Sequence, residues 1–223
     1  MRDNTAYKNE ALAALNGNWA PSVLATIGYV AAVMLFIAPY EIKFFMTDPA
    51  DLSAARAMSV FLGIYILGIF LVAGPLLVGL VNAFKVLLLS GDNKLVSNEL
   101  KIGFGNWWHH VWGYLLKSVL VLLWSLLFII PGIIKSLAYA MTNYILVDYP
   151  DLSASTAIDL SCEMMKGHKY DLFYLYLSFA GWFFLSIFTL GIGFFWLIPY
   201  AQTAQASFYQ DVKAEWESRH SMN

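Results

Sequence analysis

The chain has little charge for its length. Only 13% of its 223 residues are charged and 60% are hydrophobic, whereas an average soluble domain has about 25% charged residues. A soluble fold of this size could not bury that much apolar surface. The composition therefore excludes an ordinary soluble domain and predicts an integral membrane protein.

Cysteine and a basic excess are also lacking. The net charge is −2, so there is no positive field of the kind that nucleic-acid binding needs. Cys162 is the single cysteine, which excludes an internal disulfide, and without a His/Cys cluster we expect no structural zinc site. Nucleic acid, metal and other cofactors are therefore not expected, and Cys162 is interpreted as a small buried residue.

Motifs for catalysis are missing as well. There is no Ser-His-Asp spacing, no phosphate-binding glycine loop and no H-E-x-x-H helix, so we predict no catalytic residues. His109 and His110 are adjacent, and neighbours on a helix point about 100° apart, so they are interpreted as interfacial anchors rather than a metal pair. No A-x-A pattern closely follows the first apolar run, which predicts no cleaved signal peptide.

The apolar runs predict six membrane crossings, because one crossing needs roughly 20 apolar residues. Residues 21–40 and 57–84 carry no charge and are one crossing each. Residues 172–210 are uncharged and too long for one crossing, so we expect a hairpin that turns at Thr189-Leu190-Gly191-Ile192-Gly193. Residues 111–147 predict a second hairpin that turns at Pro131-Gly132; its arm 133–147 is either a full crossing or a re-entrant segment. Most Lys and Arg residues fall on the side of the termini, which predicts that both termini are cytoplasmic.

A glycine followed by an aromatic residue recurs before the first, third and fifth crossings. We interpret this as three repeat units in one membrane domain (about 1–92, 93–150 and 151–212, with a polar tail 213–223), each built from an interfacial helix and two crossings. In the third unit, residues 153–166 predict an amphipathic helix that lies on the membrane surface and is capped by Asp151 or Ser153. The aromatic rings of the corner motifs, and that of Trp108, are expected at the depth of the lipid headgroups. The corner motifs are Gly17-Asn18-Trp19, Gly105-Asn106-Trp107 and Gly167-His168-Lys169-Tyr170.

Polar side chains recur within the second helix of each unit. They are expected to face the interior, because an unpaired amide in hydrocarbon is costly. Either they form hydrogen bonds between helices, or they surround a central polar pocket for a lipid headgroup or small solute. The candidate interior residues are Asn82, Tyr139, Thr142, Asn143, Tyr200, Gln202, Thr203 and Gln205.

Charged residues near the crossings can be interpreted without a binding or catalytic role. Lys85, Lys117 and Lys135 are expected to extend to the membrane surfaces. A carboxylate cluster can bind a divalent ion when its groups converge, but helix capping and a solvated face explain part of the cluster here. We therefore predict no metal site among Asp148, Asp151, Asp159, Glu163 and Asp171.

An ordered series of motifs runs through the second half of the chain: Ile130-Pro131-Gly132-Ile133-Ile134-Lys135, Tyr144-Ile145-Leu146-Val147-Asp148-Tyr149-Pro150, Met165-Lys166-Gly167-His168-Lys169, Leu177-Ser178-Phe179-Ala180-Gly181-Trp182 and Gly191-Ile192-Gly193 through Pro199-Tyr200. With Gly17-Asn18-Trp19, this series resembles the bacterial domain-of-unknown-function 975 family. Tyr149 and Ala180 depart mildly from the family's usual residues. The resemblance implies a bacterial cytoplasmic-membrane protein, distantly similar to membrane domains of glycerophosphodiester phosphodiesterases, whose soluble catalytic domain has no counterpart here.

Three functions remain open at this stage. The first is a non-enzymatic all-α membrane bundle that binds membrane lipids, a membrane-protein partner or a second copy of itself. The second is a small transporter or channel, favoured by the repeats but opposed by the lack of a buried carboxylate relay or charged filter. The third is a lipid-modifying enzyme that acts through the acidic cluster.

Overall fold

Helices make up the architecture of the computed structural model, which describes residues 2–46, 52–91 and 99–221. Within those ranges there is no β-strand, as the all-α prediction requires. The elements are α1 (Asn4–Leu15), α2 (Trp19–Met46), α3 (Leu52–Gly68), the π-helical segment η1 (Ile69–Ala73), α4 (Gly74–Ser90), α5 (Glu99–Gly105), α6 (Trp107–Leu127), α7 (Ile129–Ala138), α8 (Thr142–Asp148), α9 (Ala154–Met164), α10 (Lys169–Leu177), α11 (Ala180–Phe188) and α12 (Phe194–Ser221).

Five stretches of helix in the described part of the chain are long and apolar enough to cross a membrane. They are Trp19–Met46, Met58–Ser90, Trp107–Leu127, Ile129–Asp148 and Lys169–Phe188. These stretches fit a multi-pass membrane protein and contain the first five expected crossings. The expected sixth crossing begins α12, which is not among the five, so six crossings and the threefold repeat stay predictions.

The glycine-rich turn of the last hairpin is confirmed. Helix α11 ends at Phe188 and α12 begins at Phe194. In the turn that joins these helices, Leu190 has a φ of 53° and Gly191 a φ of 90°. The backbone N–H of Gly191 donates to the carbonyl of Ser186, and the N–H of Gly193 donates to Thr189 Oγ1. Left-handed backbone closes the end of α11, as glycine allows.

The other hairpin turns three residues earlier than expected. The break lies at Phe128, whose backbone is extended (φ −159°, ψ 147°), and not at Pro131-Gly132. Pro131 lies in the first turn of α7, where its missing N–H removes no helical hydrogen bond. Gly132 instead allows α6 and α7 to approach closely, because a Cβ there would lie 2.3 Å from Ser125 Oγ.

Helix α9 has the predicted residues but a different environment. Ser153 caps it by accepting a hydrogen bond from the N–H of Thr156 at 3.1 Å. Its apolar face, including Ala157 and Ile158, is buried against α6 and α8. The prediction that this face lies on the membrane surface is therefore wrong, because protein side chains already cover it.

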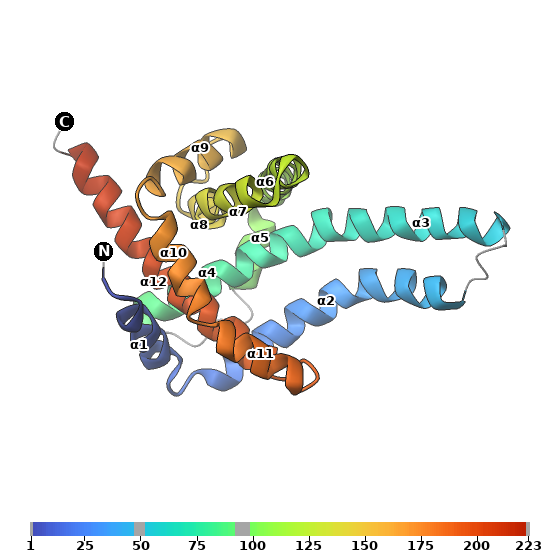
Figure 1. Ribbon diagram of the computed structural model, residues 1–223, viewed down its shortest axis with the longest axis horizontal. Coiled ribbons are helices and arrows are strands. Elements are labelled where there is room, and N and C mark those ends of the chain that lie inside the picture. The colour runs from blue at the N-terminus through green and yellow to red at the C-terminus, as the bar shows by residue number, and fades with distance from the viewer. Residues whose placement is uncertain (1, 47–51, 92–98, 222–223) are drawn as a thin grey trace.

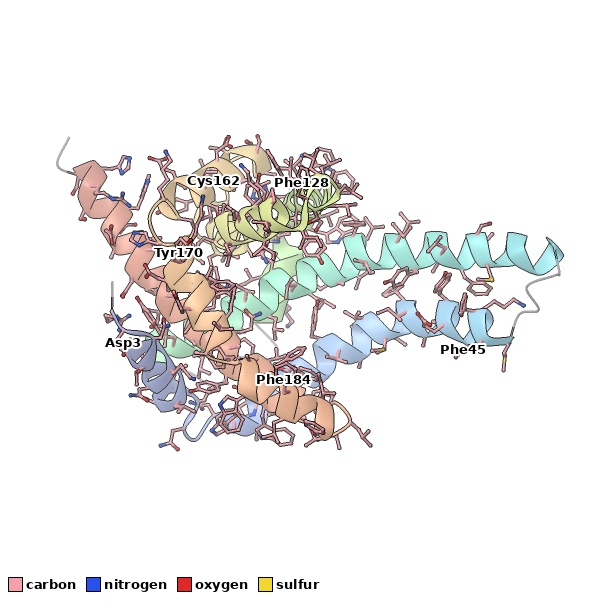
Figure 2. The ribbon with its side chains drawn as sticks, in the orientation of Figure 1. Asp3, Phe45, Phe128, Cys162, Tyr170 and Phe184 are labelled. Carbon is pink, nitrogen blue, oxygen red and sulfur yellow. The ribbon has the colours of Figure 1, made fainter. Side chains whose placement is uncertain are left out.

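The helices do not form a parallel bundle. Figure 1 shows α2 and α3 projecting from the rest as one long arm, while α6 is seen nearly along its own axis and α12 crosses the centre. Figure 2 places Phe45 near the far end of this arm, Phe128 at the α6–α7 turn and Phe184 on α11; these side chains are 82%, 73% and 61% exposed. The main core lies where α1, α4, α8, α9, α10 and α12 meet. The predicted bundle is thus a compact centre with splayed apolar hairpins.

Candidate functional site

A cavity of about 790 Å³ lies between α4, α6, α7, α8, α10 and α12. Three of the eight predicted interior residues, Asn143, Gln202 and Gln205, line it. Its wall is mostly apolar, with Leu77 and Val81 from α4 and Leu137 from α7 among the lining residues. We call this space the central cavity. Its mixture of apolar walls and a few polar groups is typical of a small-molecule site.

The other five predicted residues do not line the central cavity. Asn82 and Thr142 are buried elsewhere, and Thr203 Oγ1 donates to the carbonyl of Pro199 at 2.7 Å. Tyr139 is buried against Ile158 of α9, and its ring lies 5.9 Å from Lys135 Nζ. Tyr200 lines a separate apolar pocket beside Trp19, Trp182 and Trp196. Of the eight predicted interior residues, three therefore line the central cavity and five are placed elsewhere in the protein.

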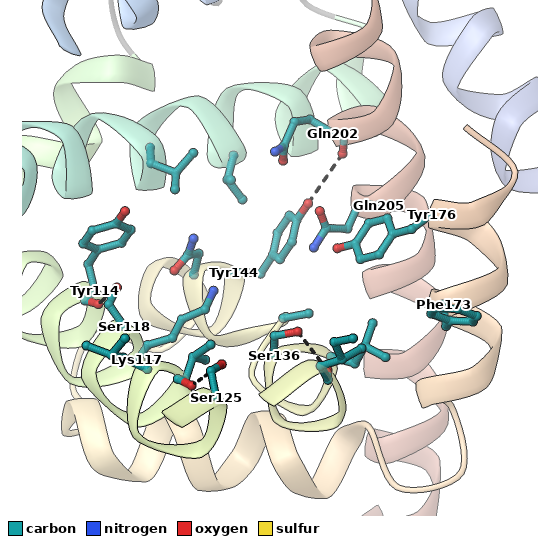
Figure 3. A pocket seen from close by; sticks show the side chains of 18 residues that line it. Tyr114, Lys117, Ser118, Ser125, Ser136, Tyr144, Phe173, Tyr176, Gln202 and Gln205 are labelled. Atoms are coloured by element: carbon teal, nitrogen blue, oxygen red, sulfur yellow. Dashed lines mark hydrogen bonds between the residues drawn. The ribbon is translucent and has the colours of Figure 1, made fainter. Parts of the chain in front are cut away.

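Lys117 extends into the central cavity from α6 (Figure 3). It lies ten residues from each end of this helix, roughly 15 Å along the axis at 1.5 Å per residue. The prediction that it reaches the membrane surface is therefore wrong. No acidic side chain lines the cavity, and within the described ranges no carboxylate forms an ion pair with Lys117. The cavity holds a positive charge that the surrounding protein leaves uncompensated.

Two buried side-chain oxygens of the cavity residues are also unpaired. Asn143 Oδ1 and Gln202 Oε1 have no hydrogen-bond partner among the described residues. A buried polar group without a partner costs about 1–3 kcal/mol. The nearby wall is fixed, because Tyr144 stacks on Tyr209 at 4.7 Å and 14° and donates to the backbone carbonyl of Gln202 at 3.5 Å. The cavity therefore offers one cation and two acceptors in a rigid apolar frame.

The acidic residues do not converge on a metal-sized site in the described part of the chain. Asp148, at the end of α8, forms ion pairs with Lys85 of α4 and with Lys213 of α12, the latter at 2.7 Å, and accepts a hydrogen bond from Tyr209 at 2.8 Å. The surface-reaching interpretation of Lys85 is therefore wrong as well. This largely buried cluster joins three helices, and each Asp148 oxygen has at least one partner in it.

The glycines of two of the predicted corners have left-handed backbone. The φ values are 79° at Gly17 and 90° at Gly167, whereas Gly105 ends α5 and Asn106 precedes α6 without a capping hydrogen bond from its side chain. Asn18 Nδ2 donates to the carbonyl of Ala14 at 3.0 Å, which holds the first corner against α1.

The corner side chains differ from simple surface anchors. His168 is buried, with Nε2 lying 3.1 Å from Glu215 of α12, whereas Tyr170 is 76% exposed. Trp19 packs against the cluster around Phe84. Trp107 Nε1 donates to the carbonyl of Leu71 at 2.7 Å. In an α-helix this carbonyl would accept from the residue four positions later, but that residue is Pro75, which has no N–H. Of these four corner side chains, only Tyr170 is mostly exposed.

Comparison with known proteins finds one family model that matches part of the chain. Residues 126–216 match the family model described as "Protein of unknown function (DUF975)", which confirms the resemblance seen in the sequence. No curated protein and no solved structure matches the chain, so the distant similarity to membrane domains of phosphodiesterases stays a prediction. The matched residues include Asn143, Gln202 and Gln205 of the central cavity, whereas Lys117 precedes them.

Proposed function

We propose that this chain, whose residues 126–216 match DUF975, is a non-enzymatic multi-pass membrane protein that binds an anionic lipid headgroup in its central cavity. The observation that carries the proposal is Lys117, a half-buried cation at the middle of an apolar helix, facing a cavity without a carboxylate. A charged residue at such a position is costly and is usually retained for a function.

An anion is the ligand that best completes the charge balance. A buried ammonium without a counter-ion is strongly disfavoured, and binding a phosphate beside Lys117 would remove that cost. Charge-assisted hydrogen bonds of this kind are about twice as strong as neutral ones. The remaining polar atoms, Asn143 Oδ1 and Gln202 Oε1, require donors, which the hydroxyl or amino groups of a phospholipid headgroup supply.

The same proposal includes six crossings, three repeat units and cytoplasmic termini. Helix α12 begins with an uncharged stretch that runs as far as Gln210, long enough for a sixth crossing. The order short helix, then a helical pair, occurs three times, with α1, α5 and α9 as the short helices, which supports three repeats. The Lys and Arg distribution supports cytoplasmic termini, and the family resemblance supports a bacterial inner membrane.

Native mass spectrometry of the full chain, purified in mild detergent, tests the proposal. The wild type is expected to retain one phospholipid, and Lys117→Gln to lose it, because the variant removes the one cation among the described residues of the cavity wall. Lys135→Gln is the matched control: this lysine lies on the neighbouring helix α7 against the Trp124 ring at 4.7 Å, outside the cavity wall, and its variant should retain the lipid. Equal retention by the wild type and Lys117→Gln would contradict the proposal.

A further inference from the structure

A second, smaller pocket adjoins the central cavity. It measures about 380 Å³ and lies between α7, the start of α10 and the corner before α10. Ile133, Leu137 and Phe173 line both spaces, so the two share a wall. We call this second space the side pocket. Apart from Lys169 and Tyr170 at one end, the side chains around it are apolar.

We propose that the side pocket holds an acyl chain of the lipid whose headgroup binds at Lys117, so that the ligand is a whole anionic lipid and enters between α7 and α10. This inference rests on the function proposed above and specifies its ligand. A cavity that contains a cation and borders an apolar pocket has the polarity of an amphiphile. A free solute such as a sugar phosphate would leave the side pocket unused.

The exposure of the side-pocket residues supports entry from the lipid phase. Ile130 is 71% exposed and Ile134 is 46% exposed, so the pocket opens on the surface of the protein. In a membrane, an acyl chain could move into it without passing through water.

The dimensions favour a single chain over a protein partner. A stable protein–protein contact buries roughly 800 Å² on each partner, whereas the side pocket is a small volume bounded by one face of α7 and the first turns of α10. The wall that it shares with the cavity containing Lys117 also distinguishes it from the open apolar surface of α2 and α3. The occupant is therefore inferred to be one acyl chain.

The test compares two probes on the full chain in amphipol. Glycerol 1-phosphate supplies a headgroup alone, and its 1-octanoyl ester supplies the same headgroup with one chain. We expect the ester to bind the wild type at least about tenfold more tightly than glycerol 1-phosphate, because chain burial adds apolar contact. Ile134 lines the side pocket but not the central cavity, so Ile134→Trp should reduce the space in the side pocket and abolish this advantage while binding of glycerol 1-phosphate stays the same.

Controls separate the possible failures. Ile187→Trp alters a similarly exposed isoleucine on α11 (51%) and should behave like the wild type, and Ile130→Trp should repeat the effect of Ile134→Trp. If the ester has no advantage in the wild type, or keeps it in both pocket-filling variants, the acyl-chain inference is wrong while the headgroup site stands. If Lys117→Gln binds glycerol 1-phosphate as tightly as the wild type does, the headgroup site fails and the acyl-chain inference fails with it.

Discussion

The α2–α3 arm and helix α8 of the compact centre both belong to stretches that are apolar enough to cross a membrane, but they differ in what surrounds their side chains. In α2 the buried residues are Ser22, Ala25 and Thr26, all near its start, and Leu35 is 74% exposed. In α8, by contrast, five consecutive residues from Thr142 are buried. Hydropathy alone does not separate these regions. The arm needs lipid to cover it, whereas the centre is covered by protein and contains the buried polar groups.

The largest expected difference between the two regions concerns charge. Asp148→Asn leaves Lys85 and Lys213 without their shared carboxylate, and losing one partner of a buried ion pair costs about 3–5 kcal/mol. The variant should unfold at clearly lower temperature in a fixed detergent. Glu41→Gln on the α2–α3 arm is the control and should change stability by less than about 0.5 kcal/mol. Equal effects would show that the centre is no more tightly packed than the arm.

Apolar truncations should show the same contrast with a smaller effect. Leu146 in α8 is fully buried, and Leu35 in α2 is mostly exposed. Leu146→Ala is expected to lower the free energy of unfolding by about 3 kcal/mol, through lost contacts and a residual cavity, and Leu35→Ala by about 0.5 kcal/mol or less. Denaturant titration in one detergent measures both. A larger loss for Leu35→Ala would mean that the arm packs against protein in solution.

The smallest expected effect is a pH dependence at the edge of the centre. Burial raises the pKa of Asp211, but hydrogen bonds from Arg2 and Tyr7 outweigh this and hold the pKa below its usual value. The attachment of the N-terminus to α12 is therefore stabilised above the ordinary aspartate pKa of about 3.9 and weakens as the pH falls through the lower pKa of the folded state. Because Arg2 is 43% exposed, the effect is about 1 kcal/mol or less.

Hydrogen exchange of the α1 amides, corrected for intrinsic rates, measures this attachment. Exchange should quicken in the wild type as the pH falls below about 4, because the attachment weakens from the ordinary aspartate pKa of about 3.9 down to the lower pKa of Asp211 in the folded state. In Asp211→Asn it should be faster throughout and show little dependence on pH in that range. Identical profiles for the two proteins would contradict the role given to Asp211.

Local signals in the sequence predicted local structure well. Gly191 and its neighbours predicted the last turn because left-handed backbone favours glycine, and Ser153 predicted the start of α9 because its side chain can cap a helix. Polarity within apolar runs also identified Asn143, Gln202 and Gln205, although it could not separate them from Thr203, which pairs with its own helix.

Contacts between distant residues could not be predicted in this way. Lys85 and Asp148 are 63 positions apart, and Trp107 reaches Leu71 of the π-helical segment η1 over 36 positions. The role of Lys117 depends on α4, α10 and α12 closing around it. Its position in the middle of an uncharged run was a usable signal, because a lysine there is too far from either end of α6 to reach the membrane surface.

The central claim is that Lys117 binds a lipid phosphate, and solid-state NMR of the protein in phospholipid bilayers tests it most directly. The measurement is the dipolar coupling between ¹⁵N-labelled lysine Nζ and lipid ³¹P, with the Lys117 signal assigned by its loss in Lys117→Gln. The account predicts an Nζ to phosphorus distance of about 4 Å, the sum of a charge-assisted contact of about 2.8 Å and one P–O bond. If the wild type and Lys117→Gln show the same coupling, Lys117 does not contact a lipid phosphate and the claim is contradicted.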